Sequence, residues 1–584
     1  MFLTRGRQHS WERVPVPLVS LALLLASCGG GGSSGYSGGS NNSGMGSSPT
    51  VPPASVMLSI QPTSIVAGQS ATLTWSTQSV DSCTASAGWT VSQASGGTAT
   101  VTPTAAGTVT YTLTCMATAA AVGAYGMAGA PTSGATSATA TLTVTPASTF
   151  SFTSLVSDTS GTGALTTDPD LVNPWGIVLG PGTPMWTANN HSETSTLYDG
   201  NGKAQPTSGP LVVGLPKSAS NVAFDPTGIA FNATTDFVVS AAGKSGAAKF
   251  IFSGEGGMIA GWSPTVSRTS AITMYTDAGG AVYKGLAIAT NGTANFLYAT
   301  DFHNAKIDLF DATYARQTLA AGKFVDPNLP AGYSPFGIQA AHNGAGGTWQ
   351  IYVTYAMAQP PDNHDNMNGA GLGLIDIYDA AGTFVKRLVS PGGALNAPWG
   401  LAPTPPDFGT LSNVLLVGNF GDGKINGYDA SSGQWIGTII DSTGAAFSSP
   451  GLWGIAFGND AANQPHNTLF YAAGPNDEAN GVYGRIDLGA APTLNAPPVV
   501  TLTVPSGTLT GSVTLTATAQ DPIAIAKIQF LVGTTPIGTA TTSPFTVQWD
   551  TTTVTNGSVS LTAVATDSDG NVGTSAAVTA AVSN

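Results

Sequence analysis

The sequence predicts an all-β protein, a six-bladed β-propeller flanked by two Ig-like β-sandwich domains. Charged residues make up only 8% of its 584 residues, against about a quarter in a typical soluble domain. Short stretches of alternating Thr, Val and other strand-forming residues recur between turn residues, a pattern typical of sandwiches and barrels. One short signature also recurs through the middle of the chain, which is the mark of a repeat architecture.

The N-terminus reads as an export signal. Three arginines (Arg5, Arg7 and Arg13) precede an apolar stretch at 16–26, which is too short to span a bilayer. The following Leu-Ala-Ser-Cys, ending at Cys28, resembles the lipobox of bacterial lipoproteins. The resemblance implies a signal peptide at 1–27, a lipid on Cys28 and a membrane as partner. Gly29 in place of Asp suits the outer membrane or cell surface of a bacterial envelope. An ordinary signal peptide is the alternative.

Residues 28–52 are rich in Gly and Ser and predict a flexible tether. Residues 53–147 then carry short alternating strands around Trp75 and resemble bacterial Ig-like domains. Cys83 and Cys115 remain once Cys28 is used by the anchor, and an oxidising compartment favours a disulfide that staples the two sheets. A redox-active pair is disfavoured because no C-x-x-C spacing is present.

Residues 497–584 repeat the alternating pattern and also resemble a bacterial Ig-like module. Asp521, Asp567 and Asp569 stand where strands are expected to end. Their oxygens suit Ca²⁺, but the full EF-hand pattern is missing and a turn is the simpler interpretation.

The middle region, 148–490, repeats a signature such as Asn-Pro-Trp-Gly-Ile at 173–177. Its glycines are Gly176, Gly228, Gly285, Gly337, Gly400 and Gly454, spaced 52, 57, 52, 63 and 54 residues apart. That period suits four-stranded propeller blades. The last unit lacks a fourth strand, and a spare strand at 150–158 precedes the first unit. We therefore expect residues 150–158 to close the ring as the outer strand of the last blade.

The signature and strand order resemble TolB-like and NHL-like six-bladed propellers. More closely, the region resembles a bacterial propeller family without an established activity, whose members often carry an exosortase sorting tail. The chain departs from that pattern because it ends in Ala-Ala-Val-Ser-Asn. The resemblance implies a fold and no particular reaction.

Loops between the second and third strands of each blade should lie at one propeller face. These loops are unusually rich in charged and polar side chains for a chain with so few charges. The side chains are Asn189, His191, Glu193, Lys244, Asp301, His303, His364, Asn419 and Asp422. Function favours loops on a rigid scaffold. His191, Glu193, Asp301 and His303 could hold a divalent metal such as Ca²⁺, although such residues also cap strand ends. No cofactor is certain.

Aromatic residues begin four of the inner strands: Trp175, Phe336, Trp399 and Trp453. They could stack on sugars or anchor a protein partner, or simply pack between blades.

The charge balance of −14 opposes nucleic-acid binding. No P-loop, H-E-x-x-H or G-x-S-x-G motif is present. The sequence therefore favours a lipid-anchored binding or adhesion module for a glycan, peptide or protein. A metal-dependent hydrolase, lactonase or lyase and a purely structural envelope protein are the alternatives.

Overall fold

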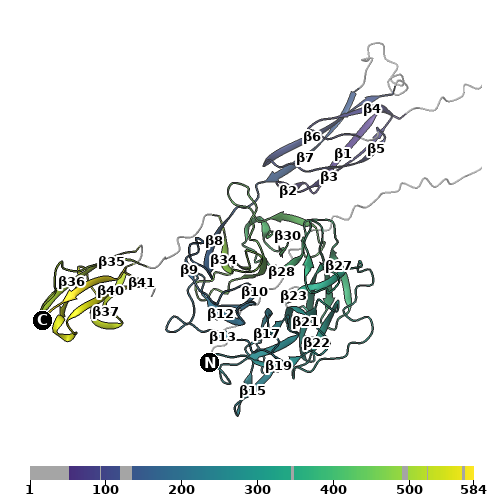
Figure 1. The fold of residues 1–584 in the computed structure, drawn as a ribbon. Coiled ribbons are helices and arrows are strands. Elements are labelled where there is room, and N and C mark those ends of the chain that lie inside the picture. The colour runs from purple at the N-terminus through teal and green to yellow at the C-terminus, as the bar shows by residue number, and fades with distance from the viewer. Residues whose placement is uncertain are drawn as a thin grey trace, which may run out of the picture.

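The computed structural model describes residues 52–91, 94–118, 135–342, 347–489, 498–521, 524–568 and 572–584. The predicted signal peptide, Cys28, nearly all of the tether and Asp569 lie outside these residues. Helical structure within them is limited to two short 3-10 turns, Gly409–Leu411 and Thr551–Thr553. No helix in this part of the chain is long and apolar enough to cross a membrane. The described protein is therefore all-β (Figure 1).

The N-terminal body is built from two sheets. One has the order β1 (Ser55–Gln61), β3 (Ala71–Gln78) and β5 (Gly96–Val101), and the other β2 (Ser64–Val66), β7 (Ala135–Thr145), β6 (Gly107–Ala117) and β4 (Val80–Ala85). Alternate residues of β3 are buried, so Ala71, Leu73 and Trp75 face the core while the threonines between them face solvent. The alternation of apolar residues with threonine in the sequence therefore corresponds to one buried face and one solvent-facing side of the sheet.

Cys83 and Cys115 are joined by a disulfide, and they lie directly opposite each other on β4 and β6. The bond therefore links neighbouring strands of a single sheet. The expectation that it would staple one sheet to the other was wrong, because both cysteines belong to the same antiparallel ladder.

The middle of the chain, from residue 150 to 488, is propeller-like (Figure 1). Among the described residues, it contains seven sheets: six begin with a strand that carries the repeated signature, and the seventh is a two-stranded hairpin described below. The first of these six sheets contains β10 (Pro174–Val178), β11 (Met185–Asn189), β12 (Thr194–Tyr198) and β13 (Val213–Gly214). The second contains β14 (Pro226–Phe231), β17 (Phe250–Gly254), β18 (Met258–Trp262) and β19 (Ile272–Thr276). The third contains β20 (Tyr283–Thr290), β21 (Asn295–Asp301) and β22 (Lys306–Phe310).

The other three sheets complete this body. The fourth contains β23 (Tyr333–His342), β24 (Trp349–Ala358), β26 (Leu374–Asp379) and β27 (Phe384–Val389), with β25 (Asn366–Met367) beside β24. The fifth contains β28 (Pro398–Pro403), β29 (Leu415–Asn419), β30 (Ile425–Tyr428) and β31 (Trp435–Thr438). The sixth contains β32 (Leu452–Phe457), β33 (Leu469–Ala473), β34 (Val482–Leu488), β8 (Phe150–Ser157) and β9 (Thr166–Thr167). The first strands contact one another in a closed order, β10–β14–β20–β23–β28–β32 and back to β10.

The repeated glycines explain why this ring can close tightly. A Cβ on Gly337 would lie 2.0 Å from the carbonyl oxygen of Trp399, and one on Gly454 would lie 2.6 Å from that of Trp175. Gly176, Gly228, Gly285 and Gly400 likewise face the first strand of the next sheet. The signature keeps glycine because a side chain there would push adjacent sheets apart.

The prediction for residues 150–158 is confirmed, since β8 pairs antiparallel with β34 on the outer side of the last sheet. One strand assignment in the second unit was wrong. Residues 238–241 form β15 (Val238–Ala241), which pairs with β16 (Lys244–Ala247) in a separate hairpin between β14 and β17. Lys244 therefore lies beyond the C-terminal end of β14, away from the face where the first strands begin.

The C-terminal body also has two sheets. One contains β35 (Val499–Thr503), β36 (Ser512–Gln520) and β39 (Phe545–Asp550), and the other contains β38 (Thr535–Ala540), β37 (Ile525–Val532), β40 (Gly557–Asp567), β41 (Val572–Thr574) and β42 (Val578–Val582). Its core packs around Trp549, Phe530 and Leu515.

Candidate functional site at the mouth of the ring

The residue before each ring glycine lies where a first strand enters the ring. These residues are Trp175, Thr227, Lys284, Phe336, Trp399 and Trp453. Loops between second and third strands reach the same face, because neighbouring strands within each sheet are antiparallel. We call this face the mouth of the ring.

Six aromatic side chains close the ring just inside the mouth and form what we call the central plug: Trp175, Phe302, Phe336, Trp399, Phe420 and Trp453. Trp175 and Trp453 stack with ring centroids 3.4 Å apart, and Trp399 meets Trp453 edge-on at 5.9 Å. Within the ring lies a cavity of about 40 Å³ lined by the first strands, which has room for a few water molecules. This cavity is too small for a sizeable ligand.

Lys284 interrupts the aromatic set with a positive charge. Its side chain is only 2% exposed, although Lys is seldom buried unless it is paired. The Nζ atom forms an ion pair with Glu255 and lies 5.1 Å from the centroid of the Trp175 ring, within reach of a cation–π interaction. Trp399 Nε1 donates to the Lys284 carbonyl oxygen at 2.9 Å and ties the plug to this strand.

Polar side chains surround Lys284 and form what we call the mouth cluster: Asn173, Asn190, Glu255, Lys284, His364, Asp365 and Glu478. They come from loops or strand starts of five of the six sheets. Asn190 Nδ2 donates to Glu255 Oε2 at 2.9 Å, and Asn173 Nδ2 donates to Glu478 Oε2 at 2.7 Å. Trp453 Nε1 donates to Asn173 Oδ1 at 3.1 Å. The cluster therefore continues the plug outward as a connected hydrogen-bonded network.

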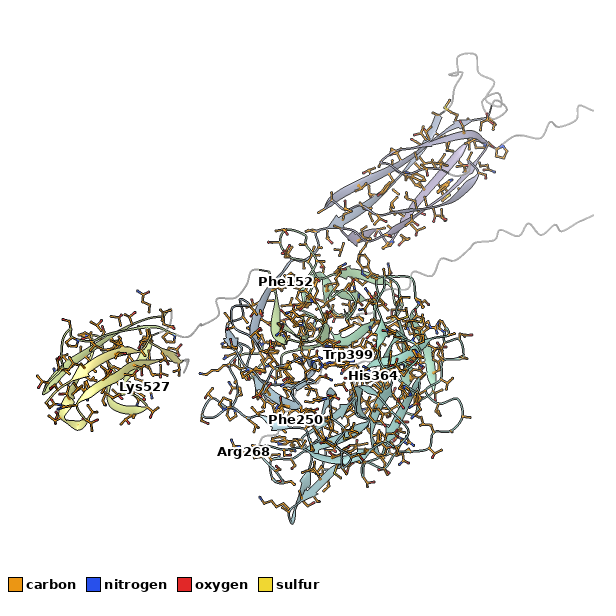
Figure 2. All side chains as sticks on the ribbon, in the orientation of Figure 1. Phe152, Phe250, Arg268, His364, Trp399 and Lys527 are labelled. Carbon is orange, nitrogen blue, oxygen red and sulfur yellow. A yellow bond between two sulfur atoms is a disulfide. The ribbon has the colours of Figure 1, made fainter. Side chains whose placement is uncertain are left out.

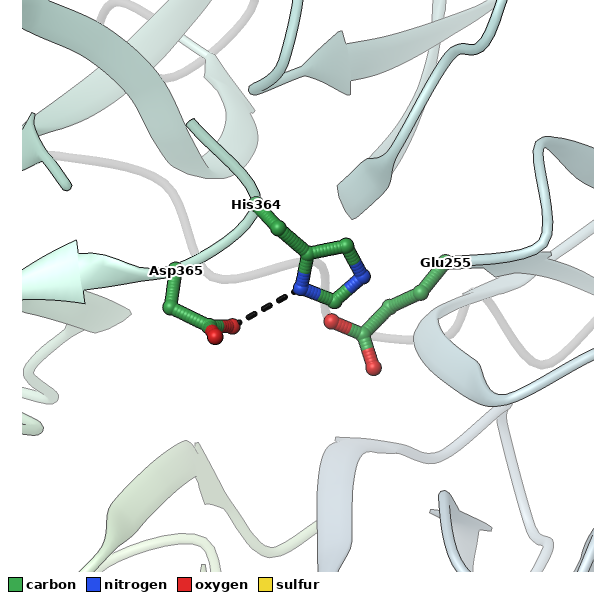
Figure 3. A group of neighbouring side chains, drawn as sticks. All are labelled: Glu255, His364 and Asp365. Atoms are coloured by element: carbon green, nitrogen blue, oxygen red, sulfur yellow. Dashed lines mark hydrogen bonds and ion pairs between the residues drawn. The ribbon is translucent and has the colours of Figure 1, made fainter. Parts of the chain in front are cut away.

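The loop between β24 and β26 carries His364 and Asp365, which lie beside Glu255 (Figure 3). Their side chains are exposed to solvent. His364 Nδ1 donates to Asp365 Oδ1 at 2.9 Å. Glu255, His364 and Asp365 offer ligand atoms that all lie within 4.8 Å of one another. In the view of Figure 2, His364 and Trp399 both appear near the middle of the propeller-like body. An approaching ligand would meet His364 and Asp365 first.

The carboxylates of the mouth carry shifted pKa values. Burial, and then the negative charges of Glu193 and Glu255, raise the pKa of Asp225 to about 6. Burial also raises the pKa of Glu478, opposed by its hydrogen bond from Asn173. The hydrogen bond between His364 and Asp365 raises the pKa of the histidine and lowers that of the aspartate. His364 and Asp365 are thereby favoured as a charged pair.

Three of the residues predicted as site candidates lie buried at strand ends. Asn189 Nδ2 donates to Thr194 and Thr196, and Asn419 Nδ2 donates to Ala394 O and Asp422 Oδ1. Asp301 accepts from the backbone of Val282 and Asn304 and forms an ion pair with Lys306. These three side chains hold turns together.

The predicted metal set does not assemble in the structure. The carboxylate of Asp301 is engaged by Val282, Asn304 and Lys306. His303 Nδ1 donates to the carbonyl oxygen of Asp362 at 2.6 Å. Glu193 Oε2 accepts from the backbone of Phe224 at 3.0 Å, and His191 is exposed. Among the described residues, the three-ligand group that does form is Glu255, His364 and Asp365.

The four predicted aromatic residues face one another rather than solvent. Trp175, Phe336, Trp399 and Trp453 are each 9% exposed or less. Their rings form most of the central plug, so the packing alternative describes their place in the structure. They shape the floor beneath the mouth cluster.

Glu255 and Lys284 were not predicted from the sequence. Glu255 was overlooked because β15 was taken for the second strand, which displaced the expected loop to 243–245; the Gly-Glu-Gly-Gly turn at 254–257 was the available signal. Lys284 stands before a ring glycine, where three repeats have Trp. It is the one charged residue among the six at this repeat position, and that contrast could have identified it.

A second buried charged group lies in the fourth sheet, outside the mouth. Asp376 on β26 is fully buried and shares Arg387 with Asp326. Burial, and then the negative charge of Asp326, raise the pKa of Asp376 to about 7. Its Oδ2 atom has no hydrogen-bond partner among the described residues.

The fold and its modules define a propeller-like protein that carries an Ig-like domain. Residues 498–563 match the model of a bacterial Ig domain, in agreement with the predicted C-terminal module. Among solved structures, a virginiamycin B lyase from Staphylococcus aureus aligns with 58% of this chain and 100% of its own, at 13% identity and a TM-score of 0.33. A Bacteroides thetaiotaomicron protein of unknown function aligns with 75% of this chain and 99% of its own, at 11% identity and a TM-score of 0.35.

The chain belongs to the family of the uncharacterized protein R648 of Acanthamoeba polyphaga mimivirus. The two are 34% identical over 343 residues, which cover 57% of this chain and 78% of the relative. Uncharacterized protein L690 of the same virus is 31% identical over 330 residues, covering 55% of this chain and 81% of its own. These relatives are viral and lend no support to the bacterial propeller family expected from the sequence.

Proposed function

We propose that this protein is an extracytoplasmic binding module, held at a membrane through a lipid on Cys28, whose six-bladed propeller binds a polar ligand at its mouth. The Ig-like modules serve as spacers or adhesive units. The observation that carries the binding function is the mouth cluster. In a chain with only 8% charged residues, charged side chains from several sheets converge above the aromatic floor.

The position of the cluster supports binding rather than a purely structural role. The plug already closes the ring, and the glycine contacts already join the sheets. Burying Lys284 beside Glu255 costs desolvation, which packed apolar residues would avoid. His364 and Asp365 retain side-chain exposures of 45% and 69%, so the cluster remains accessible from solvent.

The test is a glycan and metabolite array on the full chain, with the variants Glu255→Gln and His364→Gln. We expect both variants to weaken a ligand that wild type binds. His466→Gln is the matched control, because His466 pairs with Asp460 at 2.8 Å much as His364 pairs with Asp365. It lies between β32 and β33, at the opposite end of its sheet from the mouth. Ligands that bind wild type and all three variants with equal affinity would refute the mouth as the binding site.

The lipid anchor has a separate test. Wild type expressed in a bacterium should fractionate with membranes and incorporate labelled palmitate, and Cys28→Ser should do neither. Equal membrane association of both proteins would refute the anchor.

A metal-dependent hydrolase or lyase is the second candidate, because Glu255, His364 and Asp365 form a three-ligand group. Lys284 Nζ forms an ion pair with Glu255 and lies 3.6 Å from Asp365 Oδ1. Its ammonium already supplies positive charge there and would repel a divalent ion. Elemental analysis and melting temperatures with Ca²⁺, Zn²⁺ or EDTA decide the question. A stoichiometric ion that is lost in Glu255→Gln would support the metal site.

A further inference from the structure

We propose that the mouth cluster binds the carboxylate group of its ligand, and that Asp365 occupies the carboxylate position when no ligand is bound. The inference rests on the proposed binding function and specifies the chemistry of that site.

Two cationic donors converge on a single oxygen of Asp365. His364 Nδ1 lies 2.9 Å from Asp365 Oδ1, and Lys284 Nζ lies 3.6 Å from the same atom. The shorter distance is a hydrogen bond, whereas the longer one exceeds the usual length of about 2.8 Å for an ammonium–carboxylate bond. The lysine is therefore only loosely engaged on this side.

The two carboxylates beside Lys284 differ in how firmly they are held. Glu255 also accepts from Asn190 and its side chain is 12% exposed, so it is a fixed partner. Asp365 is 69% exposed. Its backbone is fastened, because Gln359 N donates to Asp365 O at 2.8 Å and β25 pairs with β24 directly after it. Rotation of the Asp365 side chain alone would free the carboxylate position without opening the loop.

A third donor belongs to the aromatic floor beneath Lys284. Trp175 Nε1 is buried and has no hydrogen-bond partner among the described residues, although its ring lies 5.1 Å from Lys284 Nζ. Buried donors in proteins are normally satisfied. A water molecule bound beneath the ligand would satisfy this indole.

Charge balance favours a carboxylate over other ligand classes. Exchanging Asp365 for a ligand carboxylate replaces one negative charge by another beside Lys284 and His364. A cation at this point would meet the Lys284 ammonium. A phosphate would bring additional negative charge close to the carboxylates of Glu255 and Glu478. The pKa of Glu478 is already raised by burial.

The carboxylate could come from an acidic sugar or from the C-terminus of a peptide. Two matched pairs of probes separate these sources by titration calorimetry at pH 6: D-glucuronate with D-glucose, and N-acetylglycine with N-acetylglycinamide. We expect at least one acid to bind roughly 10- to 100-fold more tightly than its neutral counterpart, the range of a charge-assisted hydrogen bond. Preference confined to glucuronate would indicate a saccharide, and preference confined to N-acetylglycine a peptide terminus.

Three variants of the full chain complete the test. Asp365→Asn removes the internal competitor and should tighten binding of the preferred acid about 1.5- to 5-fold, the worth of an exposed ion pair. Asp460→Asn is the matched control, an exposed aspartate that is also paired with a histidine, and should leave binding unchanged. The double variant Lys284→Met with Glu255→Gln removes both buried charges together and should weaken binding at least about tenfold.

Equal affinity for each acid and its neutral counterpart, or no binding by wild type and Asp365→Asn, would overturn the carboxylate assignment. So would an Asp365→Asn affinity no higher than that of Asp460→Asn, a comparison that decides the matter even if the double variant fails to fold. A neutral array ligand lost in Glu255→Gln would leave the binding function standing while this inference fails. Array ligands unaffected by every mouth variant would refute the function itself.

Discussion

The ring of glycines makes a quantitative prediction about how the propeller-like body is held together. A Cβ built on Gly337 would lie 2.0 Å from the Trp399 carbonyl oxygen, whereas real Cβ atoms do not come closer than 3.0 Å to other heavy atoms. Gly337→Ala must therefore separate two adjacent first strands by at least 3.0 − 2.0 = 1.0 Å. Because the first strands form a closed ring, movement at one contact disturbs the others. We expect a loss of about 3 kcal/mol or more, the upper part of the range for overpacked cores.

Thermal unfolding by calorimetry measures this loss. A destabilisation of about 3 kcal/mol lowers the melting temperature of a large domain by roughly 6 to 12 °C. The effects of the other ring substitutions should follow the same distance: Gly228 at 2.4 Å, Gly400 at 2.5 Å, Gly454 at 2.6 Å, Gly176 at 2.7 Å and Gly285 at 3.0 Å.

Gly209→Ala is the control, because a Cβ there meets nothing within 4 Å and the backbone is not left-handed. It should be neutral or slightly stabilising, since Ala restricts the unfolded chain. The steric explanation of the signature would be refuted if Gly337→Ala cost no more than Gly209→Ala.

Three further predictions concern pH, packing and the disulfide. The pKa of Asp376 is raised to about 7 in the folded protein, so its contribution to stability is complete below about pH 4 and is lost as the pH rises through 7. That loss amounts to about 4 kcal/mol at most, and denaturant titrations should show a flatter pH profile for Asp376→Asn. Trp453→Ala should cost about 3–5 kcal/mol in the same assay, because Trp453 is 1% exposed in the plug, whereas Trp435→Ala, at an exposed position, should cost far less. Replacing Cys83 and Cys115 by Ser should destabilise the N-terminal body by about 3–4 kcal/mol, given a loop of 32 residues; calorimetry should show that transition shifted and the others unchanged.

Much of the fold could be predicted because its physical causes are local and repeated. The interval between ring glycines and the missing fourth strand of the last unit together predicted the pairing of β8 with β34. The extra hairpin β15–β16 could not be predicted in the same way. Its residues alternate and end in a turn as a blade strand would, and only pairing with the rest of the sheet distinguishes the two.

The candidate site was harder to predict because its chemistry depends on which side chains are satisfied. Asp301 and Asn189 looked like exposed loop groups, yet they are consumed by hydrogen bonds at strand ends. His364 was identified from its loop, but its neighbour Glu255 lies more than a hundred residues earlier in the chain. Glu255 would also have required the correct assignment of the second strand in its unit. Lys284 was not selected as a site residue because the Lys-Gly-Leu-Ala-Ile stretch at 284–288 was treated only as one copy of the repeated signature.

The pairing of β8 with β34 also sets the order in which the chain can mature. Residue 150 leaves the ribosome more than three hundred residues before residue 488, its partner in the ladder. At about 5–20 residues per second, translation of that interval takes on the order of tens of seconds. During this time the N-terminal body can fold completely, whereas β8 has only the two-residue strand β9 to pair with and lacks its long partner β34. An exported chain would thus carry an open strand edge on β8 until β34 has been synthesised, and a chaperone that covers this edge would improve its yield.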